Sequence, residues 1–440
     1  MDKKFVNTHK AIWFYGCLSV IAYGYLALHS QQYAQATLTE MWIVCGACGV
    51  FSILCWHECF KLERQNILLP ARLISLFIGF AIVFRVIGII SFPILEDDFY
   101  RYLWDGKMTI ETGSPYGIIP SDFFASTDLD STFSHILGLI NHPDIPTVYG
   151  PVNQYIFAFT SLFFPAQVWP LQLIFALVDL GIILLLLKLT KPSFVLLYAW
   201  SPLMIKEFSF TAHPDVVGAF FLIAAFYAYT FRAWYWAAIL LAFSAGVKVF
   251  ALVAAPLLLK LNWRAWIVFF ITAMVLSLPF GVKAAWFPEG LSAMAGHWLF
   301  NAPMYILLDP FFRFQVIKIS LLALFVFVAI SYFFFVSYRF YFEGKLLPIR
   351  ADYLYGMFFL CIPVLNPWYF VWLLPFAAIY PSRWAWVASI SLLLSYASGI
   401  NLPQSEYALY QQPNWLLIIE FGCVFVALFI DIKQRNQPIK

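Results

Sequence analysis

The segment Ile182-Ile-Leu-Leu-Leu-Leu187 is apolar at every position, and so is the segment Leu321–Val328. A strand of a transmembrane barrel would alternate apolar and polar residues, so these runs indicate membrane-spanning helices. Similar runs recur along the whole chain of 440 residues, which is 63% hydrophobic and 11% charged. Soluble domains are about 45–50% apolar and about 25% charged. The sequence therefore predicts an all-α polytopic membrane protein.

The length of the chain limits the number of crossings. A helix needs about 20 apolar residues to cross a bilayer, so the sequence predicts a bundle of roughly 11–14 transmembrane helices surrounded by membrane lipids. No repeat of fixed period and no Ser- or Gly-rich linker divides the chain. We therefore expect residues 1–440 to form a single domain. The same composition excludes a disordered protein, a coiled coil and a nucleic-acid-binding protein.

Basic residues predict the orientation in the membrane. Lys3, Lys4 and Lys10 place the N-terminus in the cytoplasm by the positive-inside rule. Alternating the spans from there puts 18 of the 26 lysines and arginines, and the C-terminus, on the same side. Residues 94–147 then form one large outer loop with nine acidic and two basic residues. The alternation requires that residues 148–164 do not fully cross the membrane, so we expect a re-entrant or interfacial helix there.

Polar side chains gather near the expected outer ends of the helices, in five segments far apart in sequence. An ionisable side chain costs about 2.5–3.5 kcal/mol at the centre of a bilayer, so those beside apolar runs are candidates for a functional site. The segments contribute the cluster Glu96-Asp97-Asp98, the pair His213 and Asp215, Lys248, the pair His297 and Asn301, and Asn366 with Trp368. Their convergence on one side of the membrane predicts a single site there.

The acidic segment at residues 96–107 is the most informative of these. A helix over it would place four polar side chains on one face, at positions i, i+3, i+4 and i+7. These residues are Asp98, Arg101, Tyr102 and Asp105. An aspartate at the outer end of a membrane helix can act as a general base on a hydroxyl, and an arginine can hold a phosphate through two N–H groups. The alternative is an interfacial helix that is merely stabilised by an Asp–Arg pair.

Other candidates also have structural interpretations. Lys248 either pairs with a substrate phosphate or is a lysine that stabilises a helix end. His213 and Asp215 either belong to the site or cap the following helix. Arg85 lies inside the third apolar run and needs a buried partner, for which the sequence offers Asp179 or Glu207.

Six segments, in this order, carry a family resemblance. They are EDDFYRYLWDGK (96–107), TGSPYGIIP (112–120), NHPDIPTVYGPVNQYIFAF (141–159), AWSPLMIKEFSFTAHPDVVGAF (199–220), HWLFNAPMY (297–305) and NPWYFVWLLP (366–375). The chain resembles the bacterial membrane glycosyltransferases of the GT-C class, and within that class the mannosyltransferase-like group that uses polyprenyl-phosphate sugars. It departs from the usual pattern at Gly150, where a second proline is common, and in an additional helix pair before the acidic loop.

The resemblance implies a GT-C-like bundle with amphipathic helices in its outer loop, and a specific reaction. A monosaccharide, with mannose favoured, is transferred with inversion from a polyprenyl-phosphate donor to a hydroxyl of a lipid-linked or glycan acceptor at the outer face of the cytoplasmic membrane. The family's essential aspartate matches Asp98 or its neighbour Asp97. We expect Arg101, Lys248 and His213 to bind the donor phosphate. The expected substrate-binding residues are Tyr102, Trp104, Asp105, Tyr116, Tyr149, Asp215, His297, Asn301 and Trp368.

No cofactor is expected, because no Gly-rich phosphate loop is present. A divalent cation at the Asp97–Asp98 pair is not indicated either, since a carboxylate pair without a histidine at ligand spacing is a weak signal. The competing function is a lipid or solute transporter, or a flippase. Transporters usually hold their polar groups near the midplane within repeated halves, and this sequence shows neither feature.

The outer loop and the basic C-terminal tail give a direct test of orientation. A cysteine introduced at Ser121 or Ser131 should react with a membrane-impermeant thiol reagent in intact cells, whereas a cysteine at Gln437 should not. Labelling at position 437 together with protection of positions 121 and 131 would reverse the orientation.

Overall fold

The computed structural model describes residues 3–33, 38–286, 288–290, 298–312, 314–342, 350–380, 382–402, 406–408 and 410–435. Over these residues the chain is helical, and β structure is limited there to one parallel bridge between Phe300 and Val364. Seven of the described helices are long and apolar enough to cross a membrane. They are α1 (Lys3–Tyr33), α2 (Leu38–Arg64), α3 (Ala71–Ile89), α7 (Trp169–Leu189), α13 (Trp263–Ser277) with its 3₁₀ extension to Phe280, α17 (Gln315–Phe342) and α21 (Asn414–Arg435). The predicted all-α polytopic membrane protein is confirmed.

The other apolar runs fold as short helices joined by 3₁₀ or π turns. Proline accounts for many of the interruptions between these helices, because it lacks an N–H group and its ring clashes with the preceding turn. Pro202, Pro256 and Pro375 each lie in the first turn of a new helix. These elements are α8 (Pro192–Ala199), α9 (Pro202–Met204), η2 (Ile205–Phe210), α10 (Asp215–Thr230), α11 (Trp234–Val247), η3 (Val249–Val253), α12 (Ala255–Leu259), η4 (Leu278–Phe280), α14 (Val282–Trp286), α16 (Pro303–Leu308), α18 (Ala351–Cys361), η5 (Pro367–Trp372), α19 (Leu374–Ile379), α20 (Arg383–Ser391) and η6 (Leu392–Tyr396). Within the described ranges, long helices therefore account for fewer crossings than the apolar runs suggested.

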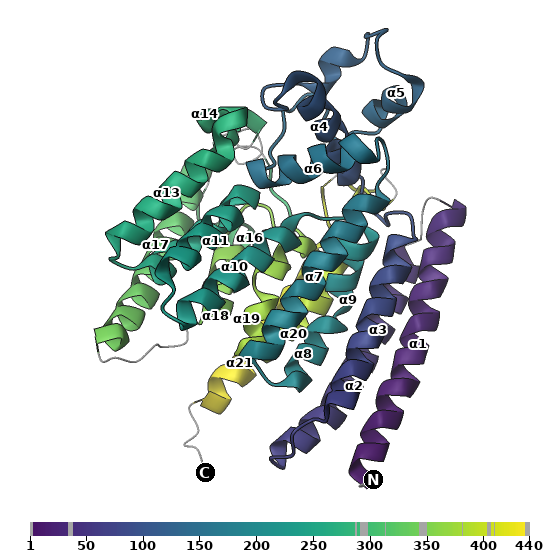
Figure 1. The fold of residues 1–440 in the computed structure, drawn as a ribbon, viewed down its shortest axis with the longest axis vertical. Helices are drawn as coiled ribbons and strands as arrows, with labels where there is room; N and C mark the ends of the chain where they lie inside the picture. Colours follow the sequence, from purple (N-terminus) through teal and green to yellow (C-terminus); the bar gives the residue numbers. More distant parts are fainter. Residues whose placement is uncertain are drawn as a thin grey trace.

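The acidic loop and the segment after it form the elements at one end of the bundle. These are α4 (Asp98–Thr112), η1 (Pro120–Phe123), α5 (Ser131–Gly138) and α6 (Pro151–Phe163). The first turns of α1 and the last turns of α21 lie at the opposite end (Figure 1). With 13 residues, α6 is about 20 Å long, too short for a hydrocarbon core of about 30 Å. This agrees with the expectation that residues 148–164 do not fully cross.

Two glycines allow α4, α6 and α11 to approach closely. A Cβ atom at Gly106 would overlap the carbonyl oxygen of Phe157 in α6, and one at Gly150 would overlap the carbonyl oxygen of Gly246 in α11. A side chain at either position would push the helices apart. The departure from the family pattern at Gly150 therefore has a packing reason, because proline also carries a Cβ atom.

A buried ion pair connects α3 with α7. Arg85 and Asp179 each have a side chain that is only 1% exposed, and Arg85 Nε donates to Asp179 Oδ2 at 2.8 Å. Arg85 Nη1 also donates to the carbonyl oxygens of Ala81 and Ala199, and the Tyr198 hydroxyl donates to Asp179 Oδ1 at 2.6 Å. Of the two partners that the sequence offered for Arg85, the structure selects Asp179.

Removing this carboxylate should destabilise the fold strongly. The Asp179→Asn variant leaves the Arg85 guanidinium buried without a countercharge, so we expect its free energy of unfolding to fall by about 3–5 kcal/mol. The Glu58→Gln variant is the matched control, because Glu58 pairs with Lys61 at the surface and should lose at most about 1 kcal/mol. Equal melting temperatures of the two variants in detergent would contradict this role of Asp179.

Candidate active site

The acidic segment contains a helix, as the sequence predicted, and this helix, α4, begins at Asp98. Leu95, three residues earlier, has a left-handed backbone (φ 59°), and the chain turns there between α3 and α4. Asp98 lies in the first turn, where the positive end of the helix dipole favours a carboxylate. Its side chain is 21% exposed.

Asp98 faces a cavity of about 1340 Å³. This volume exceeds the 300–1,000 Å³ that is usual for small-molecule pockets. Four of the five polar segments predicted to converge contribute their polar side chains to its lining, through the cluster Glu96-Asp97-Asp98, Asp215, Lys248, and Asn366 with Trp368. The fifth segment contributes Trp298, Leu299 and Phe300 instead of Asn301. The predicted convergence is therefore present in the fold for these four segments.

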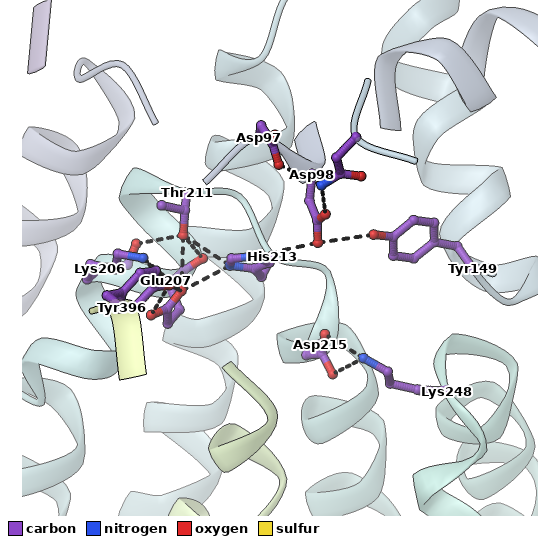
Figure 2. A network of polar contacts seen from close by, with 11 residues as sticks. Asp97, Asp98, Tyr149, Lys206, Glu207, Thr211, His213, Asp215, Lys248 and Tyr396 are labelled. Atoms are coloured by element: carbon purple, nitrogen blue, oxygen red, sulfur yellow. Dashed lines mark hydrogen bonds and ion pairs between the residues drawn. The ribbon is translucent and has the colours of Figure 1, made fainter. Parts of the chain in front are cut away.

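An asparagine and a tyrosine hold the Asp98 carboxylate in place. Asn141 Nδ2 donates to Asp98 Oδ1 at 3.1 Å and to Asp97 Oδ1 at 2.6 Å. The Tyr149 hydroxyl donates to Asp98 Oδ2 at 3.3 Å, as Figure 2 shows. Both Asp98 oxygens thus have a donor, and the side chain still borders the cavity.

The two carboxylates before Asp98, those of Glu96 and Asp97, have raised pKa values. Burial raises the pKa of Glu96 well above its usual value, and the charges of Asp98 and Asp97 raise it further. Burial together with the charge of Asp98 raises the pKa of Asp97 to about 6, against the opposing effect of the Asn141 hydrogen bond. Glu96 and Asp97 therefore lie in a region that disfavours negative charge on their carboxylates.

On the other side of Asp98, His213 connects it to a buried network (Figure 2). His213 Nε2 lies 4.0 Å from Asp98 Oδ2, and His213 Nδ1 lies 3.0 Å from Glu207 Oε2. Glu207 also pairs with Lys206 at 3.3 Å and accepts a hydrogen bond from the Tyr396 hydroxyl at 3.0 Å. The His213 ring stacks on Trp368, with ring centroids 3.9 Å apart.

Lys248 and Asp215 form a second polar pair at the cavity. Lys248 Nζ lies 3.1 and 3.3 Å from the two carboxylate oxygens of Asp215 and 3.8 Å from the centroid of the Tyr369 ring. Trp372 Nε1 donates to Asp215 Oδ1 at 2.9 Å. Asp215 begins α10, and no side-chain cap is formed at this helix end. The alternative that Asp215 only caps a helix is therefore wrong.

A comparison with known families identifies the type of protein. The model of the MptA/B family, described as alpha-(1→6)-mannopyranosyltransferase, N-terminal domain, matches residues 18–264, more than half of the chain. The chain belongs to this mannosyltransferase family. No curated protein and no solved structure matches it. The matched range contains Asp98, His213 and Lys248, whereas Trp368 and Tyr396 lie beyond it.

Several residues expected to bind substrate lie outside the cavity lining of this mannosyltransferase. Asp105 is buried and accepts hydrogen bonds from Arg101 Nε at 2.9 Å, from Thr147 and from Gln154 at 3.1 Å. Trp104 is buried among apolar side chains and packs against Phe123. Helical spacing correctly placed Asp105 on the face of Asp98, but two turns, or about 10 Å, further along the axis.

Two tyrosines and an asparagine also differ from the expectation of direct contact with substrate. Tyr102 is 1% exposed and stacks on Phe157, and the Tyr116 hydroxyl donates to the carbonyl oxygen of Tyr149 at 2.9 Å. Asn301 is buried and donates to Glu420 at 2.8 Å. The cavity does border Tyr149 and Trp368, as expected. His297 lies outside the described residues.

Arg101 borders the cavity, but its guanidinium is already engaged by the protein. Its Nε donates to Asp105 and its Nη1 donates to the carbonyl oxygen of Ile145 at 2.8 Å. The third nitrogen, Nη2, is buried without a hydrogen-bond partner among the described residues. Arg101 therefore holds the loop before α6 against α4, and phosphate binding by its remaining nitrogen stays a prediction.

Sequence reasoning missed four residues of the network around Asp98. Glu207 was considered only as a partner of Arg85, although its position in the KEFSFTAHPD segment, six residues before His213, was a usable signal. Asn141 stands in a segment that carried the resemblance, but its short polar side chain gave no indication of its role. Lys206 and Tyr396 carried no signal of their own.

Left-handed backbone recurs beside the site. Non-glycine residues with positive φ include Leu95 (59°), His142 (48°), Ala212 (59°) and Asn301 (49°). Leu95 directly precedes the acidic cluster, and Ala212 directly precedes His213. Each such residue costs about 1–2 kcal/mol in backbone conformation.

Proposed function

We propose that this mannosyltransferase moves mannose from a polyprenyl-phosphate donor to a hydroxyl of a lipid-linked or glycan acceptor, with inversion and with GT-C architecture. The observation that carries the proposal is the placement of Asp98, whose carboxylate is partly exposed in a cavity of about 1340 Å³ that also contains the Lys248 ammonium. A base and a cation at one cavity are what transfer from a phosphate-linked sugar requires.

Asp98 is the general base in this proposal. As the acceptor hydroxyl oxygen forms a bond to the anomeric carbon, the Asp98 carboxylate takes the hydroxyl proton, and the bond between that carbon and the phosphate oxygen breaks with its electron pair on the phosphate. Asn141 and Tyr149 orient the carboxylate through the hydrogen bonds already described. Asp97 is the alternative base, one residue away in the same cavity lining, where Asn141 Nδ2 donates to its Oδ1 at 2.6 Å.

Lys248 binds the leaving phosphate in this proposal. Its side chain is 25% exposed and borders the cavity, whereas its partner Asp215 is almost fully buried. The ammonium therefore has room to contact a phosphate while Asp215 and the Tyr369 ring keep it in position. An oriented cation stabilises the charge that develops on the departing group.

The apolar part of the cavity favours a lipid donor over a nucleotide sugar. Phe92, Leu299 and Ile400 line the cavity and are 36%, 46% and 51% exposed. Exposed apolar side chains beside a polar centre fit a ligand that combines a hydrocarbon chain with a phosphate. The large volume of the cavity supports the same substrate class.

We place the site at the outer face of the cytoplasmic membrane, with both termini in the cytoplasm. The acidic loop that forms α4 and α5 lies at the end of the bundle opposite to the first turns of α1 and the last turns of α21 (Figure 1). Lys3, Lys4 and Lys10 at the start of the chain favour the cytoplasm for that opposite end.

The choice of base is tested by two neighbouring substitutions that remove the same charge. Asp98→Asn keeps the shape of the side chain but cannot accept the proton, so turnover should fall at least about 100-fold while donor binding remains. Asp97→Asn should have a smaller effect. The measurement is loss of radiolabelled mannose from a polyprenyl-phosphate donor in proteoliposomes, with uptake of the label into the lumen followed in parallel.

Near-normal turnover of Asp98→Asn with an inactive Asp97→Asn would move the base by one residue. Activity of the double variant would eliminate the general-base mechanism. Uptake of the label without any transfer would replace the proposed function by transport.

The donor-phosphate role predicts a selective effect of Lys248→Ala. Loss of one charge-assisted contact is worth about 1.5–3 kcal/mol, so kcat/KM for the donor should fall by about one to two decades, with a smaller change for the acceptor. Lys283→Ala is the control, because Lys283 is an exposed cation on α14 that does not line the cavity. Unchanged donor kinetics in a folded Lys248→Ala variant would assign Lys248 a structural role only.

A further inference from the structure

Three side chains with metal-ligand chemistry meet beside the cavity: Glu96 before α4, Asp98 in the first turn of α4, and His213 before α10. Glu96 and Asp98 border the cavity, whereas His213 is buried next to them. Glu96, Asp98 and His213 each offer one ligand atom, and these atoms lie within 4.8 Å of one another. A divalent cation binds oxygen and nitrogen at about 2.0–2.6 Å, so two of its ligand atoms can stand up to about 5 Å apart. We propose that Glu96, Asp98 and His213 bind one divalent cation.

The protonation of His213 suits a metal ligand. Its Nδ1 lies 3.0 Å from Glu207 Oε2 and 3.0 Å from Thr211 Oγ1, so a neutral His213 with its proton on Nδ1 would donate to the Glu207 carboxylate. The other nitrogen, Nε2, then has a free lone pair, as in the carboxylate–histidine–metal arrangement that orients metal-binding histidines. The stacked Trp368 ring fixes the plane of the imidazole.

The free nitrogen of His213 is an independent sign of a ligand. The residue is 0% exposed, and its Nε2 has no hydrogen-bond partner among the described residues. A buried polar atom without a partner costs about 1–3 kcal/mol. This atom points toward Asp98 Oδ2, 4.0 Å away (Figure 2), so a cation between the two would satisfy both.

The local charge balance also requires a cation. Glu96, Asp97 and Asp98 are consecutive, and within the described part of the chain neither Glu96 nor Asp97 forms an ion pair with a lysine or arginine. The nearby ammonium of Lys206 is already paired with Glu207. A divalent charge at Glu96 and Asp98 would offset the repulsion between these carboxylates.

The donor set indicates the class of metal. Two carboxylates with one imidazole suit a cation such as Mn²⁺, because carboxylates favour Mg²⁺, Ca²⁺ and Mn²⁺ while imidazole favours transition metals. Coordination through Asp98 Oδ2 leaves Oδ1 for the acceptor hydroxyl. Any contact of the cation with the donor phosphate rests on the proposed function, but the binding site itself does not.

The experiment is a Mn²⁺ titration of the full chain, purified in detergent and first stripped of metal with a chelator. Bound Mn²⁺ is measured by loss of the six-line electron paramagnetic resonance signal of the free aqueous ion. We expect one Mn²⁺ per chain, with affinity at least about tenfold weaker in Glu96→Gln and in His213→Ala. The matched controls Asp122→Asn and His135→Ala remove the same groups from exposed positions and should bind like the unsubstituted chain.

Absence of saturable Mn²⁺ binding to the unsubstituted chain would overturn the proposal. So would unchanged affinity in both Glu96→Gln and His213→Ala, with melting temperatures confirming that both variants are folded. Because the titration needs no sugar, Mn²⁺ binding by a chain that transfers no mannose would support the metal site and reject the proposed function. Mannose transfer by a chain that binds no Mn²⁺ would support the proposed function and reject the metal site.

Discussion

A charge buried in a membrane protein has no water to stabilise it, and much of this fold depends on the partners that its buried charges find. Arg85 and Asp179 join α3 to α7, and Arg101 and Asp105 hold the loop before α6 against α4. Additional hydrogen bonds surround each pair, as a buried ion pair needs, although Arg101 Nη2 has no partner among the described residues. These contacts fix the helices on which the cavity is built.

At the cavity, the pairing of buried negative charges with cations is incomplete. Glu96, Asp97 and Asp98 bring three carboxylates together, and the closest cations in the described structure serve other carboxylates. Such an excess of one charge in a low-dielectric region is costly unless a substrate or an ion compensates for it. The mannosyltransferase family and the geometry of Asp98 are consistent with a cost of this kind at a catalytic centre.

The sequence predicted the fold class, a helix in the acidic segment at residues 96–107 and the convergence of several polar segments, because these follow from apolar runs, helical spacing and charge. It did not predict which residues of α4 reach the cavity. Helical periodicity placed Asp98 and Asp105 on one face, but α6 covers the second of them through Gln154. It also missed the contact between Glu207 and His213, because a π turn separates these residues and changes the usual spacing.

The left-handed backbone at Leu95 and Ala212 has a consequence for substitutions at these two positions. Glycine would adopt these conformations without the steric cost that leucine and alanine bear. Leucine and alanine therefore hold the acidic cluster and His213 in defined positions at a cost in backbone conformational energy. A glycine at either position would remove this steric cost, but it would also give up the packing of Leu95 and Ala212 and free the backbone beside the acidic cluster and His213.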